Sequence, residues 1–330
     1  MVRGEGRSLE SDRGRRWARR LLLAGVVLGA PIAAGALLRR RAEPPSAPRW
    51  GRAHRYAGRS GFEVVFQELG SGPPILLLHS FGPGYDANQW RGAAEVLAAR
   101  HRVFVPDLPG WGRTQGAGAH RPERYLELVE DFLAGVVREK AVIAAAGLAA
   151  AYAVQTALDH PGRVRALALV SPLGLGDDDP ARSVAESFIG KLLSLPVVSA
   201  SVLDVLTSRA ALEHHLRKEV YAAPERVDAA LLEHHYRASH TSAARAALAA
   251  YLRGDLWLDA TEDLADLQAP VWLAWGRQSK TPPVEAADHW LHQTAGADLA
   301  VFEGAGALPH AEVPALFCRG LERFLEGLAD

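Results

Sequence analysis

The chain has 330 residues, of which 48% are hydrophobic and 23% are charged. This composition excludes a chain that is disordered, collagen-like or coiled coil throughout, and it supplies enough apolar side chains for a large core. Lysine and arginine (37) nearly balance aspartate and glutamate (38), so we expect no nucleic acid among the partners. The single cysteine, Cys318, excludes an internal disulfide and a cysteine-built zinc site, and we expect no metal and no cofactor.

An uncharged segment follows a basic N-terminal tail of residues 1–20. Residues 21–38 carry no charge over 18 positions, and a helix of that length spans roughly 27 Å, close to the thickness of a bilayer's hydrocarbon core. We expect a transmembrane anchor with the body of the protein outside the cytoplasm. A cleaved export signal is the alternative, because Arg19 and Arg20 precede a leucine run and residues 34–36 read Ala-Gly-Ala. A core or interfacial helix is a third interpretation.

The remaining sequence predicts one large α/β domain. Residues 39–60 contain many proline, arginine and glycine residues and are expected to form a linker. Short apolar runs then recur at 62–69, 75–78, 103–105, 141–145, 166–170, 271–275 and 299–302. Helix-length amphipathic stretches separate several of them, at 91–99, 122–138 and 148–159. This alternation predicts a doubly wound, mostly parallel sheet, with residues 61–171 and 270–330 as its core.

Residues 172–269 interrupt the alternation. They contain no convincing strand, but they contain several segments with helical periodicity. An all-helical insertion between two strands of a parallel sheet is expected to cover the carboxyl ends of the strands, where ligands enter such folds. We therefore predict a helical cap over residues 172–269.

Two motifs follow predicted strands and carry a resemblance to a known family. Residues 79–82 read His-Ser-Phe-Gly, and residues 107–114 read Asp-Leu-Pro-Gly-Trp-Gly-Arg-Thr. They resemble the α/β-hydrolase fold superfamily, in its single-domain type with a helical cap, whose members carry H-G-x-G and D-x-x-G-x-G-x-S at these places. The resemblance covers residues 61–328. It implies an oxyanion loop and pocket formed by His79, Ser80, Phe81, Gly82 and Leu148.

The resemblance also implies where a Ser-His-Asp triad should lie, and the matching positions lack it. Catalysis in this superfamily needs a nucleophile on a sharp G-x-S-x-G turn, a histidine base and a carboxylate that orients the base. The turn here reads Ala-Ala-Gly-Leu-Ala, with Gly147 in the place of the nucleophile. Ser279 stands in the place of the carboxylate and Ala307 in the place of the base. The resemblance therefore implies a degenerate triad.

Other polar residues are candidates for a displaced site. Ser80 and Ser171 are predicted at the same end of the sheet, and His310 lies three positions after Ala307. A serine nucleophile needs a base within hydrogen-bond reach, so a Ser80 or Ser171 pair with His310 stays open, beside a purely structural role for His310. The histidines at 214, 215, 234, 235 and 240 are expected to be surface or capping residues rather than metal ligands.

We expect a membrane-anchored, hydrolase-like pseudoenzyme that acts as a ligand-binding, scaffold or regulatory protein. Its expected partners are the membrane and either a small hydrophobic ligand or a protein. The alternative is an enzyme of the same superfamily that acts on an ester or lipid through displaced catalytic residues. A third hypothesis is a structural subunit of a membrane complex.

Overall fold

The computed structural model describes residues 50–59, 61–115, 120–175, 188–194, 196–260 and 264–328. The basic tail and the expected transmembrane segment at 21–38 lie outside these ranges. Within the described residues, no helix combines the length and the hydrophobicity needed to cross a bilayer.

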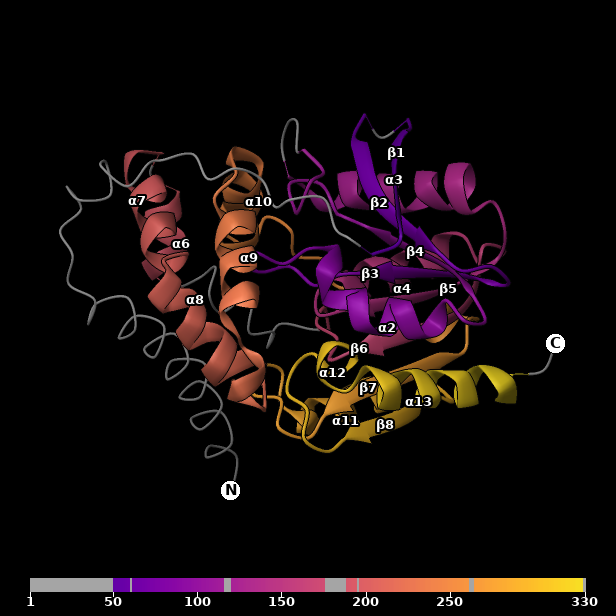
Figure 1. Cartoon of the computed structure of the whole chain (residues 1–330). Coiled ribbons are helices and arrows are strands. Elements are labelled where there is room, and N and C mark those ends of the chain that lie inside the picture. The colour runs from indigo at the N-terminus through magenta and orange to yellow at the C-terminus, as the bar shows by residue number, and fades with distance from the viewer. Residues whose placement is uncertain are drawn as a thin grey trace, which may run out of the picture.

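A single eight-stranded sheet forms the centre of the molecule (Figure 1). Its strands are β1 (Arg52–Ala57), β2 (Glu63–Leu69), β3 (Pro74–Leu78), β4 (Arg102–Pro106), β5 (Ala141–Ala146), β6 (Val164–Val170), β7 (Val271–Gly276) and β8 (Asp298–Phe302). They lie in the order β1-β2-β4-β3-β5-β6-β7-β8; β2 is antiparallel to both of its neighbours, β1 and β4, and all other neighbouring strands are parallel. The expected doubly wound, mostly parallel α/β fold is confirmed.

Continuous apolar runs form the inner strands because both faces of the sheet are covered. In β3, Ile75 and Leu77 belong to one buried cluster while Leu76 and Leu78 belong to the other, since successive side chains point to opposite faces. The helices that cover the sheet are α2 (Arg91–Leu97), α3 (Pro122–Phe132), α4 (Ala149–Asp159), α11 (Ala287–Gln293), α12 (Pro309–Glu312) and α13 (Pro314–Gly327). Side chains of α2 and α13 join the first cluster, and those of α3, α4 and α11 join the second.

Strand β1 corrects one sequence prediction. Its residues lie within 39–60, which we expected to be a linker. Every residue of β1 nevertheless pairs with a residue of β2. His54 stacks on Phe66 at 5.2 Å between ring centroids, and Tyr56 meets Phe132 edge-on at 6.1 Å. These two aromatic side chains occupy alternate positions and therefore share one face of the strand. The many arginine and glycine residues nearby hid this period-two pattern.

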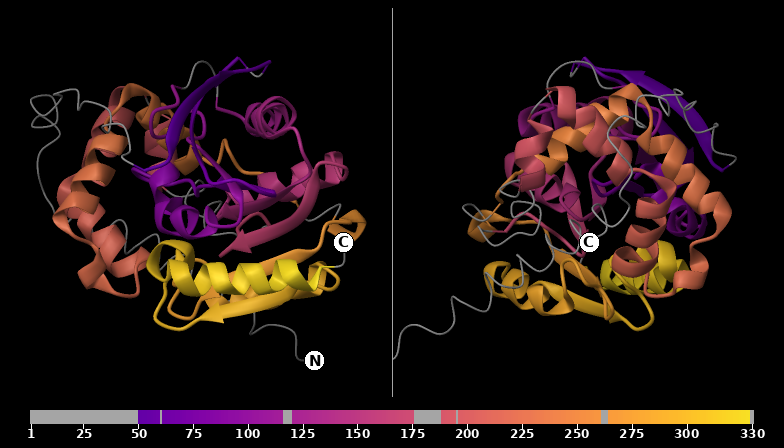
Figure 2. Two further views of the ribbon diagram at one scale, coloured as in Figure 1. Left: turned by 45° about the vertical axis from the view of Figure 1, so that its right-hand side comes forward. Right: turned by 90° about the vertical axis from the view of Figure 1, so that its left-hand side faces the viewer.

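The chain after β6 forms the expected all-helical cap. Its helices are α6 (Phe188–Leu193), α7 (Pro196–Leu206), α8 (Arg209–His215), α9 (Ala229–Ser239) and α10 (Ser242–Leu252), with the shorter segments η3 (Leu216–Val220) and η4 (Pro224–Arg226). Ser208, Asp228 and Thr241 accept hydrogen bonds from the first turns of α8, α9 and α10, which fixes where each helix begins. The arrows of the parallel strands point toward this group of helices, so the cap lies at the carboxyl ends of those strands (Figure 2).

Buried polar contacts attach the cap to the core. Glu312, which is 4% exposed, accepts hydrogen bonds from Gly306 N at 2.6 Å and from Ala222 N at 2.9 Å. Gly306 belongs to the core loop after β8, whereas Ala222 follows η3 in the cap. The Tyr152 hydroxyl of α4 also donates to Leu256 O, at 2.7 Å. The cap therefore packs on the core through specific hydrogen bonds as well as apolar contacts.

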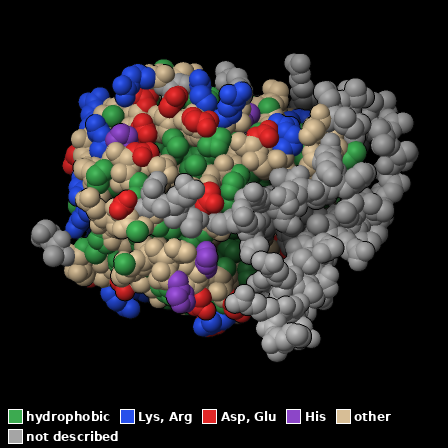
Figure 3. All heavy atoms as spheres, turned by 180° about the vertical axis from the view of Figure 1, so that it is seen from behind, with side chains coloured by type: hydrophobic (Ala, Val, Ile, Leu, Met, Phe, Trp, Pro, Cys, Tyr) green, Lys and Arg blue, Asp and Glu red, His purple; other side chains and the backbone are tan. Residues whose placement is uncertain are grey.

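The surface carries both signs of charge. On the face opposite to that of Figure 1, acidic and basic side chains are interspersed (Figure 3). This distribution agrees with the nearly balanced count of charged residues.

Replacing Glu312 should weaken the attachment of the cap. In the wild-type chain the Glu312 carboxylate accepts hydrogen bonds from backbone N–H groups. In Glu312→Gln one of its oxygens becomes an amide nitrogen, which cannot accept them, so the free energy of unfolding should fall by about 1–3 kcal/mol. Urea unfolding followed by circular dichroism measures the loss. Glu285→Gln is the matched control because Glu285 is exposed. Equal stability of the two variants would contradict this role for Glu312.

Candidate active site

The turn between β5 and α4 lies at the carboxyl end of the sheet and has Gly147 at its tip. Its φ of +56° is a left-handed conformation, which glycine adopts without the penalty that a Cβ imposes. Gly147 N donates to Val170 O at 3.0 Å, and Gly147 O accepts from Leu173 N at 3.1 Å. The turn is therefore hydrogen-bonded to the end of β6 and to the segment that leads toward the cap.

Ser80 occupies the space next to this turn. A Cβ added to Gly147 would lie 2.2 Å from Ser80 Oγ, a separation at which one of the two atoms must move. Ser80 is 8% exposed, and its backbone N–H donates to Gln89 Oε1 at 3.0 Å. The sequence predicted both residues near the site without predicting their contact. The serine hydroxyl thus fills the room that a side chain at position 147 would need.

His79 fixes the loop that carries Ser80. Its Nδ1–H donates to Ser80 O at 2.8 Å, and its Nε2 accepts from Leu108 N at 3.0 Å, so the ring has one donor and one acceptor and is neutral. Burial lowers the pKa of His79 to about 4. Because both ring nitrogens bond to backbone groups, His79 holds two loops together and has no free nitrogen to accept a proton from Ser80.

His310 lies in α12 and packs against an aromatic side chain of the core. Its ring is fully buried and stacks on Trp90 with 3.8 Å between ring centroids. Among the described residues, neither ring nitrogen of His310 has a hydrogen-bond partner, and the Ser171 hydroxyl has none either. Burial lowers the pKa of His310 to about 3. The structure therefore does not join His310 with Ser80 or Ser171 in a hydrogen-bonded pair.

Ser279 and Ala307 take part in local structure. Ser279 Oγ donates to Pro282 O at 2.7 Å, which closes the turn after β7. Ala307 packs in a small apolar cluster with Leu216, and its N–H donates to Val220 O at 2.9 Å. Ser279 thus closes a turn of the core, and Ala307 attaches the core to the cap.

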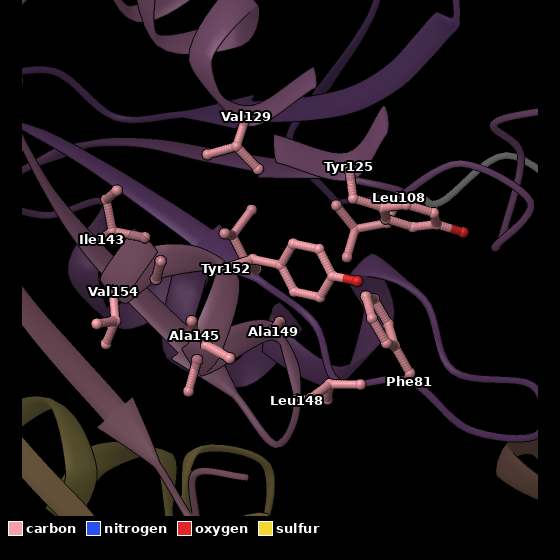
Figure 4. Close-up of a cluster of buried hydrophobic side chains, with 14 of the residues drawn as sticks. Phe81, Leu108, Tyr125, Val129, Ile143, Ala145, Leu148, Ala149, Tyr152 and Val154 are labelled. Carbon is pink, nitrogen blue, oxygen red and sulfur yellow. The ribbon is translucent and has the colours of Figure 1, made fainter. Parts of the chain in front are cut away.

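Aromatic side chains surround the turn at Gly147. Phe81 stacks on Trp111 at 5.7 Å and meets Tyr125 and Tyr152 edge-on at 5.5 and 5.6 Å. Figure 4 shows Phe81 and Tyr152 next to Leu148, the residue that follows Gly147. The buried Tyr125 hydroxyl is satisfied by Pro109 O at 2.7 Å. Within the described residues, the Trp111 Nε1–H has no hydrogen-bond partner. The interior beside the elbow is therefore aromatic, with one buried donor left unpaired.

Three cap histidines contact the core, whereas we expected the cap histidines to be surface or capping residues. They contact the loop after β3: His234 Nε2 with Asp86 Oδ2 (2.8 Å), His235 Nδ1 with Pro83 O (3.0 Å) and His215 Nε2 with the Tyr85 hydroxyl (3.3 Å). Two adjacent histidines point to different sides of a helix, so the sequence does not tell which of them contacts the core. Only the packing of α8 and α9 shows these contacts. Within the described residues, no group of histidine, cysteine and acidic side chains is arranged to hold a metal ion.

Comparisons with known proteins agree with this architecture. Residues 73–314 match the family model described as alpha/beta hydrolase fold. An uncharacterized protein of Mycobacterium tuberculosis is 29% identical over 279 residues, which cover 81% of this chain and 79% of that protein. The pimeloyl-(acyl-carrier protein) methyl ester esterase of Aeromonas hydrophila is 26% identical over 264 residues, which cover 79% of this chain and 99% of the esterase.

A solved structure shares the fold at lower sequence identity. The crystal structure of a serine hydrolase involved in carbazole degradation superimposes with a TM-score of 0.68 and 21% identity, covering 83% of this chain and 99% of that chain. At this identity the similarity is one of fold.

The ion pair between His234 and Asp86 should make stability depend on pH. Burial alone would lower the pKa of His234, but the Asp86 carboxylate raises it above the ordinary value. The stabilisation should therefore be complete below about pH 6.5, the ordinary histidine value, and should be lost as the pH rises through the raised pKa. Burial raises the pKa of Asp86, but His234 lowers it, and the net result is a pKa below the ordinary value. The ion pair is therefore also lost at strongly acidic pH, where Asp86 becomes protonated.

Unfolding free energies between pH 5.5 and pH 9 measure this effect. The stability difference between the wild-type chain and His234→Asn should shrink as the pH rises. His292→Asn, which changes an exposed histidine of α11, should give a difference that does not vary in this way. A difference for His234→Asn that is constant across the range would contradict the ion pair.

Proposed function

The chain belongs to the α/β-hydrolase fold family, and on that premise we propose that it is a non-catalytic member that binds a small hydrophobic ligand. One observation carries this proposal: the elbow turn has no side chain at its tip, and Ser80 fills the adjacent space. Removing a catalytic triad from a serine hydrolase costs on the order of 10⁶ in turnover. A chain with glycine, serine and alanine at the three family positions is therefore expected to bind without turning over.

The surroundings of the elbow support a hydrophobic ligand over a polar one. The Phe81, Trp111 and Tyr152 side chains are at most 3% exposed and lie together at the carboxyl end of the sheet. Apolar and aromatic walls with few polar groups are typical of sites that bind small organic molecules. A scaffold or regulatory role in which the protein binds a partner is compatible with the same architecture.

We also propose that residues 21–38 anchor the protein in a membrane with its body outside the cytoplasm. The uncharged length of the segment supports an anchor, and the arginine pair before it keeps export through a cleaved signal as the alternative. Carbonate extraction of membranes tests the proposal: an anchored chain stays in the pellet, whereas a chain found in the soluble fraction would contradict it.

Rebuilding the triad should create activity that the wild-type chain lacks. Because a side chain at position 147 would collide with Ser80 Oγ, the restored variant needs Ser80→Gly beside Gly147→Ser, Ser279→Asp and Ala307→His. The left-handed turn should make the new serine cost about 1–3 kcal/mol of stability. Hydrolysis of p-nitrophenyl butyrate is the readout, and the control carries Gly147→Ala with the other three changes.

The variant should exceed both its control and the wild-type chain by roughly 10² or more, a small part of what a complete triad supplies. Wild-type hydrolysis as fast as that of the variant would contradict a non-catalytic role.

A specific observation also keeps a second function open, namely an enzyme that uses Ser80 as a displaced nucleophile. Its hydroxyl lies almost where the side chain of the elbow residue would be. Labelling the full chain with a fluorophosphonate tests this function, with Ser80→Ala as the matched variant. Our proposal predicts equal, background labelling of both proteins. Stoichiometric labelling that disappears in Ser80→Ala would establish the second function.

A further inference from the structure

A cleft of about 990 Å³ opens on the side of the cap, between α6, α7, α10 and the start of α3. Neither Gly147 nor Ser80 lines it. Helix α10 lies between the cleft and part of the aromatic cluster, because Tyr251 of this helix meets Phe81 at 6.0 Å. The cleft reaches the cluster at one point, where His120 of its lining hydrogen-bonds with the Tyr125 hydroxyl. The cleft is therefore a second candidate site, distinct from the elbow, and its volume lies within the range of small-molecule pockets.

One part of the cleft is apolar. Leu193 of α6, Leu203 of α7 and Ala249 of α10 contribute to its lining, and they are at most 5% exposed. Their side chains come from three different helices and form a continuous part of the main hydrophobic cluster. An unbranched hydrocarbon chain placed along them carries no polar group that this part of the cleft would leave unsatisfied.

Among the residues that the structure describes, the charged part of the cleft has one positive charge without an acidic partner. Arg245 is paired with Asp204, and Arg253 is paired with Asp255 at 2.6 Å. Arg121 is exposed and makes no ion pair with any described residue. Within the described part of the cleft, three arginines against two aspartates leave an excess of one positive charge.

His120 does not add to this charge at neutral pH. Its Nδ1 hydrogen-bonds with the Tyr125 hydroxyl at 2.8 Å, and that hydroxyl donates to Pro109 O, so the Nδ1–H is the donor. Burial, together with the nearby Arg253, lowers the pKa of His120 below its ordinary value. His120 therefore stays neutral beside the arginines.

We propose that this cleft binds an amphiphilic monocarboxylate, with the carboxylate at Arg121 and at the side of the Arg253 guanidinium that Asp255 leaves free, and with the hydrocarbon chain along Leu193 and Leu203. Guanidinium groups recognise carboxylates through paired, charge-assisted hydrogen bonds. The single excess charge matches a ligand with one negative charge, and the apolar lining matches its chain. Binding at this site is independent of turnover at the elbow, so it can hold or fail whatever the activity of Gly147 and Ser80.

Calorimetric titration of the full chain tests the proposal with four probes: decanoate, acetate, decyltrimethylammonium and decyl phosphate. Decanoate should bind saturably, acetate should not because it lacks the chain, and decyltrimethylammonium should bind more weakly because its charge is opposite. Arg121→Gln with Arg253→Gln should weaken decanoate binding roughly ten-fold or more. Arg277→Gln is the matched control, since Arg277 forms an exposed ion pair with Glu303 outside the cleft.

A second variant protects the test against loss of folding in the arginine double variant. Ala246 is exposed and lines the cleft, so Ala246→Trp should block it without entering the core. Ser242→Trp on the same helix, also exposed, should leave binding unchanged. Decanoate binding that survives Ala246→Trp would overturn the site. Tighter binding of decyl phosphate or decyltrimethylammonium than of decanoate would overturn the assigned ligand class.

Discussion

The left-handed turn at Gly147 is the constraint on which the candidate site depends. Its two backbone hydrogen bonds, to Val170 O and from Leu173 N, set the start of α4 and the path of the chain as it leaves β6 toward the cap. An ordinary residue in this conformation is strained, whereas glycine is not. Because no Cβ projects from the turn, Ser80 can pack against it. The geometry of a nucleophile elbow is thus present, and a neighbouring loop fills the position of its side chain.

Residues that carry the family resemblance here support the backbone. His79 connects two loops, and the Asp107 carboxylate accepts hydrogen bonds from Ala87 N and Arg113 N, each at 2.9 Å. Burial and the neighbouring Asp86 raise the pKa of Asp107 to about 7. Such interactions preserve the sheet and its loops whether or not a substrate is turned over. A family match therefore establishes the fold, and the function has to be argued from the groups at the elbow and in the cap.

Much of this architecture could be predicted from the sequence because it depends on local patterns. Apolar runs predicted seven of the strands, and flanking residues predicted Gly147 at the elbow turn. The contacts that give the site its character could not be predicted, since they join distant segments. Asp86 and His234 are 148 residues apart in the sequence, and only the packing of α9 on the core brings them into contact. The contact between Ser80 and Gly147 likewise depends on how two loops pack against each other. The sequence did not predict strand β1, because its two aromatic side chains, His54 and Tyr56, lie among arginines.

We propose that no group at the elbow attacks a substrate, and a search for a covalent intermediate is the sharpest test of this proposal. The full chain can be mixed rapidly with p-nitrophenyl butyrate and quenched in acid. Mass spectrometry then measures the mass of the intact protein. We expect an unchanged mass and release of p-nitrophenolate at the uncatalysed rate. A rapid burst of p-nitrophenolate together with a stoichiometric butyryl group on one serine would contradict it.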